Sequence, residues 1–155
     1  MKIQELDNTD TGYRPDKQEI IEWLHTQTLG VIATLDETGQ PQGATVAFSE
    51  TEDCELIIGT SETSRKAANI ARDGRLSFTV TSPEQRYTVQ LEGIARKLSD
   101  AEFEPYAERH YAKLPASAPF RNVKEQCHIL ITPTWIRFSD CNPYQWVLTE
   151  YQVED

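Results

Sequence analysis

Two neighbouring stretches decide the fold: LSFTVT at Leu76–Thr81 and YTVQLE at Tyr87–Glu92. In both, apolar residues alternate with polar ones, which is the period-two pattern of a β-strand that buries one face and exposes the other. Ser82–Glu84, which follow the first stretch, include a proline and supply turn chemistry. The two stretches therefore predict a half-buried antiparallel hairpin.

Further extended segments lie on both sides of this hairpin. Short strands are predicted at Val31–Leu35, Gly43–Ser49 and Leu56–Thr60, and because polar turns join them we expect a meander. A last strand is predicted from Cys127 to Phe138, and since proline cannot donate to a strand ladder, we expect Pro133 to interrupt it. With the hairpin, the sequence predicts six strands.

Three helical segments are inserted among these strands. The first begins at Pro15–Glu19, where proline and acidic residues suit a first helical turn. The second runs from Ser64 to about Arg72, and the third starts at Ser99, which has capping-box spacing to Glu102, and ends before Pro115. Six short strands without β-α-β alternation predict a small antiparallel barrel of the β-rich α+β class.

Length and charge limit the function classes. The 155 residues suit one domain, and we expect a polar N-terminal arm at residues 1–14 and a single domain at residues 15–155. The formal charge of −10 argues against nucleic-acid and anionic-membrane partners. No apolar run approaches the ~20 residues of a membrane span. No secretory signal opens the chain, so we expect a cytoplasmic protein.

Cysteine and histidine positions suggest neither a disulfide framework nor a metal site. The three cysteines are widely spaced without a C-x-x-C pair, and the three histidines form no H-x-x-x-H pattern. We therefore expect reduced thiols and no bound metal.

The stretch Gly59–Lys66, GTSETSRK, lies between the end of a predicted strand and the start of a predicted helix. A helix start offers unpaired N–H groups and partial positive charge, and hydroxyls with Arg65 and Lys66 add further donors. Adjacent cations oppose the helix dipole there, so an anion should compensate them. Two interpretations stay open and are equally weighted: a phosphate site, or Ser and Thr caps beside two solvated cations.

Over roughly residues 30 to 140 the sequence resembles the pyridoxamine 5′-phosphate oxidase-like FMN-binding split barrels. The most specific element is Ser64-Arg65-Lys66 at its fixed distance after a strand. The order and spacing of several pieces together carry the resemblance: Gly39–Pro41, Ala44–Phe48, Leu56–Thr60, Asn69 and Val89–Gly93.

The resemblance implies a six-stranded antiparallel split β-barrel with Greek-key topology and about three flanking helices. It also implies a homodimer with FMN at the subunit interface. The implied cofactor-binding residues come from the second, third and fifth strands and from the helix start: Thr45, Val46, Ala47, Gly59, Thr60, Ser64, Arg65, Lys66, Thr88 and Gln90. Trp135 and Phe138 are further candidates for a flavin contact, and Phe48 and Tyr111 for the border of the pocket.

Departures from the oxidases make pyridoxamine phosphate an unexpected substrate. Ser49, Leu114 and the segment Asp140–Tyr144 stand where the oxidases carry cationic elements, and Ala44 replaces a flavin-contacting arginine. Neutral replacements cannot supply charge-assisted hydrogen bonds to a phosphate. The leading expectation is an FMN-dependent oxidoreductase acting on an unidentified small molecule, with catalytic residues unknown. The alternative is a non-catalytic flavin- or haem-binding stress or storage protein.

Overall fold

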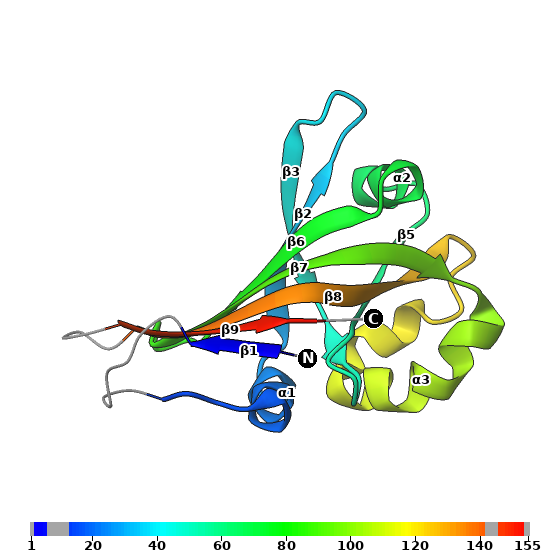
Figure 1. The fold of residues 1–155 in the computed structure, drawn as a ribbon. Helices are drawn as coiled ribbons and strands as arrows, with labels where there is room; N and C mark the ends of the chain where they lie inside the picture. Colours follow the sequence, from blue (N-terminus) through cyan, green and yellow to red (C-terminus); the bar gives the residue numbers. More distant parts are fainter. Residues whose placement is uncertain (1, 6–12, 142–145, 154–155) are drawn as a thin grey trace.

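The computed structural model of the chain describes residues 2–5, 13–141 and 146–153 (Figure 1). These residues form nine strands, three α-helices and one 3-10 helix. In chain order they are β1 (Lys2–Glu5), α1 (Lys17–His25), β2 (Leu29–Leu35), β3 (Pro41–Ala47), β4 (Ser49–Glu50), β5 (Leu56–Ser61), α2 (Arg65–Arg72), β6 (Arg75–Thr81), β7 (Tyr87–Leu98), α3 (Asp100–Lys113), η1 (Pro115–Phe120), β8 (Gln126–Cys141) and β9 (Trp146–Gln152).

The strands form one antiparallel sheet that curls into a half-barrel (Figure 1). Its main path runs β1-β9-β8-β7-β6-β2-β3, and β5 joins it through β8. The long strand β8 joins two regions, because residues 126–131 pair with β5 and residues 135–141 pair with β9. Strand β7 runs along the other edge of β8 through both parts.

The predicted α+β class with a mostly antiparallel sheet is confirmed, but the strand count is not. The six predicted strands correspond to β2, β3, β5, β6, β7 and β8, while β1, β4 and β9 were not expected. In β9 the buried positions Val147, Thr149 and Tyr151 include a threonine, which hides the alternation. Residues 2–5 of the expected N-terminal arm pair with β9, and residues 6–12 lie outside the described part of the chain.

The expected meander of the first three strands is wrong. Strand β5 pairs with β8, about 70 positions further along the chain, and β2 pairs with β6 as well as β3. The hydrophobic pattern of a strand shows which face is buried but does not identify the strand beside it.

The expected interruption at Pro133 is also wrong, because β8 continues through it. Glu92 of β7 lies opposite Trp135 and Gly93 lies opposite Pro133, so Thr134 is an extra residue without a partner on β7. A β-bulge tolerates proline because the ladder is already locally disrupted there. At Gly93 a Cβ atom would lie 2.6 Å from the carbonyl oxygen of Thr132, so only glycine fits this close approach.

Two clusters of buried side chains hold the half-barrel together. The larger one fills the inner face of the sheet beneath α1 and α2, and includes Leu24, Phe78 and Phe138. The smaller one packs α3 against β5 and β8 through Phe103 and Leu130. Among the described residues, no helix is both long and apolar enough to cross a membrane.

Candidate functional site

The start of α2 offers donors that the protein leaves unused. Ser64 caps the helix, because its Oγ accepts from the backbone N–H of Ala67 at 3.2 Å, and Thr60 Oγ1 lies 3.1 Å from the same oxygen. In the described part of the chain, the backbone N–H groups of Arg65 and Lys66 have no acceptor. A helix start with free N–H groups attracts an anion.

The side chains of Arg65 and Lys66 add charge that no carboxylate balances. Within the described ranges neither forms an ion pair or hydrogen bond, and the first turn of α2 has no acidic residue. Two cations at this end of a helix oppose its dipole. Many other cations of this acidic chain do have a carboxylate partner: Arg75, Arg86, Arg96, Lys97, Arg109, Lys113, Arg121 and Arg137.

Asn69 fixes this helix start relative to the sheet. Its side-chain amide, which is 3% exposed, donates to Thr34 Oγ1 and to Gln42 Oε1, both at 3.0 Å. Thr34 belongs to β2 and Gln42 to β3, so one buried side chain connects α2 to two strands. The position of Arg65 and Lys66 beside β3 is therefore held by hydrogen bonds as well as by apolar packing.

Two cavities lie along β3 and meet at Lys66. The first, here called the α2 cavity, has a volume of about 150 Å³ and is lined by Thr34, Gln42, Gly43, Ala44, Arg65 and Lys66. The second, here called the η1 cavity, has a volume of about 290 Å³ and is lined by Thr45, Val46, Ala47, Gly59, Lys66, Leu114, Ser117, Phe120 and Gln126.

Strand β3 ends the main path of the sheet, so one of its edges pairs with β2 and the other pairs with no described strand. An unpaired strand edge presents backbone N–H and C=O groups that are available to a ligand.

Most of the residues expected at the cofactor site come together here. Thr45, Val46, Ala47, Gly59 and Lys66 line the η1 cavity, and Arg65 joins Lys66 in the α2 cavity. Thr60 and Ser64 lie beside them and hydrogen-bond to each other at the start of α2.

Thr88 and Gln90 line neither of these cavities. They belong to β7, and two strands, β2 and β6, separate β7 from β3. At a strand spacing of about 4.8 Å, this places them about 14 Å from β3. Gln90 lies in one row with Thr79 and Val31, on the outer face of the sheet.

Three lining residues were not predicted from the sequence, namely Ser117, Phe120 and Gln126, and Leu114 was noted only as a position without the cation of the oxidases. All four come from η1 and its flanks, a segment without a motif or apolar period. The glycine at position 59 was an indirect sign of its neighbour Gln126, because a glycine inside a strand often marks the close approach of another group. A Cβ atom on Gly59 would lie 2.5 Å from Nε2 of Gln126.

Several aromatic candidates do not reach the two cavities. Phe48 is 0% exposed and lies in the core, with its ring centroid 4.2 Å from Nζ of Lys113. Phe138 is likewise buried, and Trp135 lies beside the guanidinium of Arg137. The hydroxyl of Tyr111 is 3.0 Å from Nε2 of His128.

The three positions where cations were expected to be missing have structural roles. Ser49 is buried, and its Oγ lies 2.6 Å from Nδ1 of His110. Leu114 forms part of the wall of the η1 cavity. Asp140 accepts hydrogen bonds from Arg86 and from the backbone N–H of Tyr13, while residues 142–144 of the same segment lie outside the described residues.

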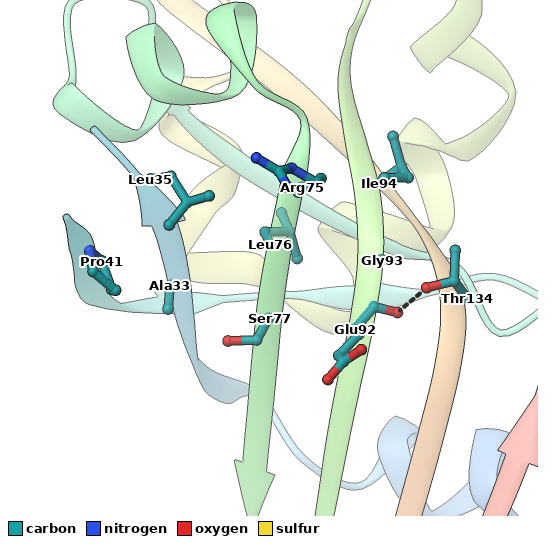
Figure 2. Close-up of a pocket in the computed structure, with 10 residues that line it drawn as sticks. All are labelled: Ala33, Leu35, Pro41, Arg75, Leu76, Ser77, Glu92, Gly93, Ile94 and Thr134. Atoms are coloured by element: carbon teal, nitrogen blue, oxygen red, sulfur yellow. Dashed lines mark hydrogen bonds between the residues drawn. The ribbon is translucent and has the colours of Figure 1, made fainter. Parts of the chain in front are cut away.

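A wider cavity of about 420 Å³ lies on the sheet between β2, β6, β7 and β8 (Figure 2). Its apolar lining includes Ala33 and Ile94, and Thr134 donates to the carbonyl oxygen of Glu92 at 3.3 Å on its border. Arg75 also lines it, but Asp73 already neutralises this guanidinium. With the carboxylate of Glu92 added, this cavity is a poor place for a phosphate.

A curled antiparallel half-barrel with a cationic helix start beside an open strand edge places the chain among the split-barrel α+β proteins. Within that class it belongs to the pyridoxamine 5′-phosphate oxidase family, whose sequence profile matches residues 16–140.

Relatives by sequence carry the name pyridoxine/pyridoxamine 5′-phosphate oxidase. The Bacteroides fragilis protein is 26% identical over 152 residues, which cover 85% of this chain and 65% of that protein. A Vibrio cholerae protein is 32% identical over 79 residues, covering 51% of this chain and 37% of that protein. The chain thus spans less than two thirds of the length of these relatives.

Solved structures share the fold at low identity. A heme binding protein from Mycobacterium smegmatis has a TM-score of 0.74 and 17% identity, covering 88% of this chain and 58% of that one. A pyridoxamine 5′-phosphate oxidase-related, FMN binding protein from Nostoc punctiforme has a TM-score of 0.65 and 15% identity, covering 94% and 100%. A FAD-binding protein from Mesorhizobium loti has a TM-score of 0.62 and 13% identity, covering 98% and 100%.

Proposed function

We propose that this protein binds a flavin, and specifically FMN, with the phosphate at the start of α2. The observation that carries the proposal is the pair Arg65 and Lys66, which lie at a helix start without a carboxylate partner in the described ranges. A terminal phosphate would accept hydrogen bonds from both side chains and from the free backbone N–H groups. FMN ends in such a phosphate, riboflavin lacks one, and in FAD a second nucleotide is attached there.

The cavities along β3 suit the rest of the cofactor. Both cations line the α2 cavity, and among the described residues that line the η1 cavity Lys66 is the only charged one. A charged phosphate and a neutral ring, separated by a five-carbon ribityl chain, match this change in polarity. The free edge of β3 at Thr45–Ala47 offers backbone groups to hydrogen-bond the ring.

The proposed activity is that of an FMN-dependent oxidoreductase acting on a small molecule. A bound flavin supplies the electron-transfer chemistry, and the protein contributes binding, orientation and electrostatics. Lys66 would hold the phosphate side, the backbone of β3 would orient the ring, and Leu114 and Phe120 would exclude water from the η1 cavity. Pyridoxamine 5′-phosphate is not the substrate we propose, because Ser49 and Leu114 provide no cation for its phosphate.

A second candidate is a flavin- or haem-binding protein without turnover. It is favoured by one observation: among the described residues that line the η1 cavity, Lys66 is the only titratable one, and none of them is a carboxylate or imidazole that could move a proton. A visible spectrum of the purified protein distinguishes bound flavin from haem. Anaerobic titration with NADH and NADPH then separates an oxidoreductase, whose flavin absorbance bleaches, from a storage protein.

We further propose a homodimer with one cofactor site on each side of a two-fold axis. Leu29 and Val31, on the outer face of β2, are 59% and 48% exposed, and exposed apolar side chains of this kind suit an interface. Thr88 and Gln90 lie too far along the sheet to meet a ligand at β3 of their own chain. In this proposal they contact the cofactor that is bound mainly by the second copy.

The phosphate assignment is tested by replacing both Arg65 and Lys66 with alanine. Charge-assisted hydrogen bonds contribute about 1.5–3 kcal/mol each, so FMN affinity should fall at least tenfold, while riboflavin affinity should change little. Quenching of flavin fluorescence measures both. The control replaces Lys17 and Lys124, two exposed lysines outside both cavities, which changes the net charge equally. Equal losses for FMN and riboflavin would remove the phosphate assignment.

A further inference from the structure

The η1 cavity has a wall that the phosphate site does not explain. Four of its lining residues, from Leu114 to Gln126 in sequence, come from η1 and its flanks, and none of them carries a charge. This wall faces the same cavity as Thr45–Ala47 of β3. It therefore lies beside whatever occupies the neutral part of the site.

Gln126 presents an unused amide to this cavity. It is the first residue of β8, and its backbone N–H donates to the carbonyl oxygen of Val123 at 2.9 Å, which fixes the backbone. Its side-chain amide has no hydrogen-bond partner among the residues that the structure describes. A primary amide has two donor hydrogens and one acceptor oxygen, so it can pair with a ring edge that carries both carbonyl and N–H groups.

Gly59 determines where that amide lies. Nε2 of Gln126 is 2.5 Å from the position that a Cβ atom on Gly59 would take, and Cδ is 3.8 Å from it. The amide therefore rests on the backbone of β5, in space that only a glycine leaves open. Because the obstructed atom is the end of a side chain, a larger residue at position 59 would displace the amide and leave the strand in place.

Phe120 contributes an aromatic surface to the same wall. It is 55% exposed, although it lines a cavity, and it forms no ring contact within the described ranges. An exposed aromatic ring at the mouth of a cavity gains by covering a flat, uncharged ligand.

We propose that Gln126 and Phe120 hold the ring end of the flavin: Gln126 hydrogen-bonds the polar edge of the ring and Phe120 packs against it. This inference rests on the proposed flavin function and assigns the two ends of the ligand to different residues. Arg65 and Lys66 recognise the phosphate, and Gln126 and Phe120 recognise the ring. Riboflavin and FMN share the ring and differ in the phosphate, so they separate these contributions.

The test measures dissociation constants of both flavins for Gln126→Ala and Phe120→Ala by fluorescence quenching. Each variant should weaken FMN and riboflavin by the same factor, about three- to tenfold, leaving their affinity ratio as in the wild type. The control is Val123→Ala, which shortens a neighbouring side chain that is 48% exposed and outside both cavities. It should change neither constant.

Gly59→Ala tests the positioning of the amide without removing it. It should weaken both flavins as Gln126→Ala does, and the double variant should be no weaker than Gln126→Ala alone, because both changes remove one interaction. Thermal melting of each protein without ligand identifies any variant that is not folded. If Gln126→Ala does not fold, Gly59→Ala and Phe120→Ala carry the test.

The outcomes separate this inference from the proposed function. A wild-type protein that binds neither flavin overturns both. If the wild type binds FMN and folded variants at Gln126, Gly59 and Phe120 keep full affinity, the ring-end assignment is wrong and the flavin function stands. Loss of FMN affinity with riboflavin affinity unchanged also overturns the assignment, because these residues would then act on the phosphate side.

Discussion

Glu50 carries a full charge inside the protein and is stabilised by two cationic side chains and a histidine. Its carboxylate is 0% exposed, contacts Lys113 Nζ, lies 2.6 Å from His25 Nδ1 and accepts from Arg109 at 3.3 Å. Burial opposes ionisation, but hydrogen bonds from Lys113 and His25 outweigh it and hold the pKa of Glu50 below its usual value. Lys113 also donates to the carbonyl oxygen of Leu24 at 3.0 Å, which connects α1 to α3.

Replacing Glu50 with alanine should destabilise the protein by about 3–5 kcal/mol, because it leaves the Lys113 ammonium buried without a counter-charge. Urea unfolding at pH 7 measures the change. Glu52→Ala is the matched control, since the Glu52 side chain is 91% exposed and its pairing with Arg109 at 3.8 Å should contribute under ~1 kcal/mol. Similar unfolding midpoints for the two variants would show that the buried network contributes little.

At the scale of residues, contacts between neighbours in the sequence could be predicted, and contacts between residues far apart in the sequence could not. Ser64, Arg65 and Lys66 are adjacent in the chain, so their position at a helix start could be predicted from spacing alone. Glu50 and Lys113 are 63 positions apart, and Gly59 and Gln126 belong to strands whose pairing was not predicted. Partnerships of this kind depend on the topology of the sheet.

Two buried histidines join α3 to the sheet. His110 of α3 lies 2.6 Å from Ser49 of β4, and His128 of β8 stacks on Phe103 of α3 with a centroid distance of 3.5 Å. The histidines are 2% and 6% exposed. Burial lowers the pKa of each to about 4. Both are therefore neutral in the folded protein at pH 7.

Lowering the pH should weaken the packing of α3 against the sheet and so lower the free energy of unfolding. The folded pKa values are depressed below the unfolded value of about 6.5, so the unfolded chain binds more protons between pH 6.5 and 4, and stability falls as the pH falls. The loss between pH 7.5 and 5 should be about 2 kcal/mol per histidine. Urea titrations at several pH values, compared with the variant His110→Gln/His128→Gln, isolate this contribution. Equal pH slopes for the two proteins would contradict it.

At the scale of elements, periodicity predicted the strands in which one face is apolar throughout. It did not predict strands whose sequence lacks that alternation. Six of the nine strands followed from alternation or short apolar runs. Strand β9 has a threonine in its buried row, and β1 is four residues long. Helix starts were predicted well, because their signals lie within a few residues: Ser99 and Glu102 form the expected capping box, and Asp16, within the stretch expected to begin the first helix, caps α1.

The whole molecule presents an apolar face that the proposed dimer would cover. Val31 on β2 is flanked by Thr45 of β3 and Thr79 of β6, and with Leu29 it forms the exposed part of this face. Since β2 lies next to β3, a second copy docked here would approach the edge along which both cavities lie.

Val31→Glu should convert the proposed dimer into a monomer, because two symmetry-related carboxylates would be placed close together in an apolar interface. Light scattering at micromolar concentration measures the mass of both proteins. Trp146→Glu is the control, since Trp146 is 64% exposed on β9, at the other end of the sheet from β3. A wild-type monomer, or a Val31→Glu dimer, would rule out this interface.

The bulge at Thr134 gives β8 two different phases along one strand. Before it, odd-numbered residues such as Ile129 and Ile131 face the main core, and after it the even-numbered Ile136 and Phe138 do so. Loss of Thr134 would leave Pro133 and Trp135 adjacent, opposite Gly93 and Glu92, and both inward rows would stay in place. Loss of a residue elsewhere in β8 would instead turn one of the two buried rows to the outer face. The bulge is therefore a point at which β8 can lose one residue without turning a buried row to solvent, whereas the paired positions on either side of it cannot.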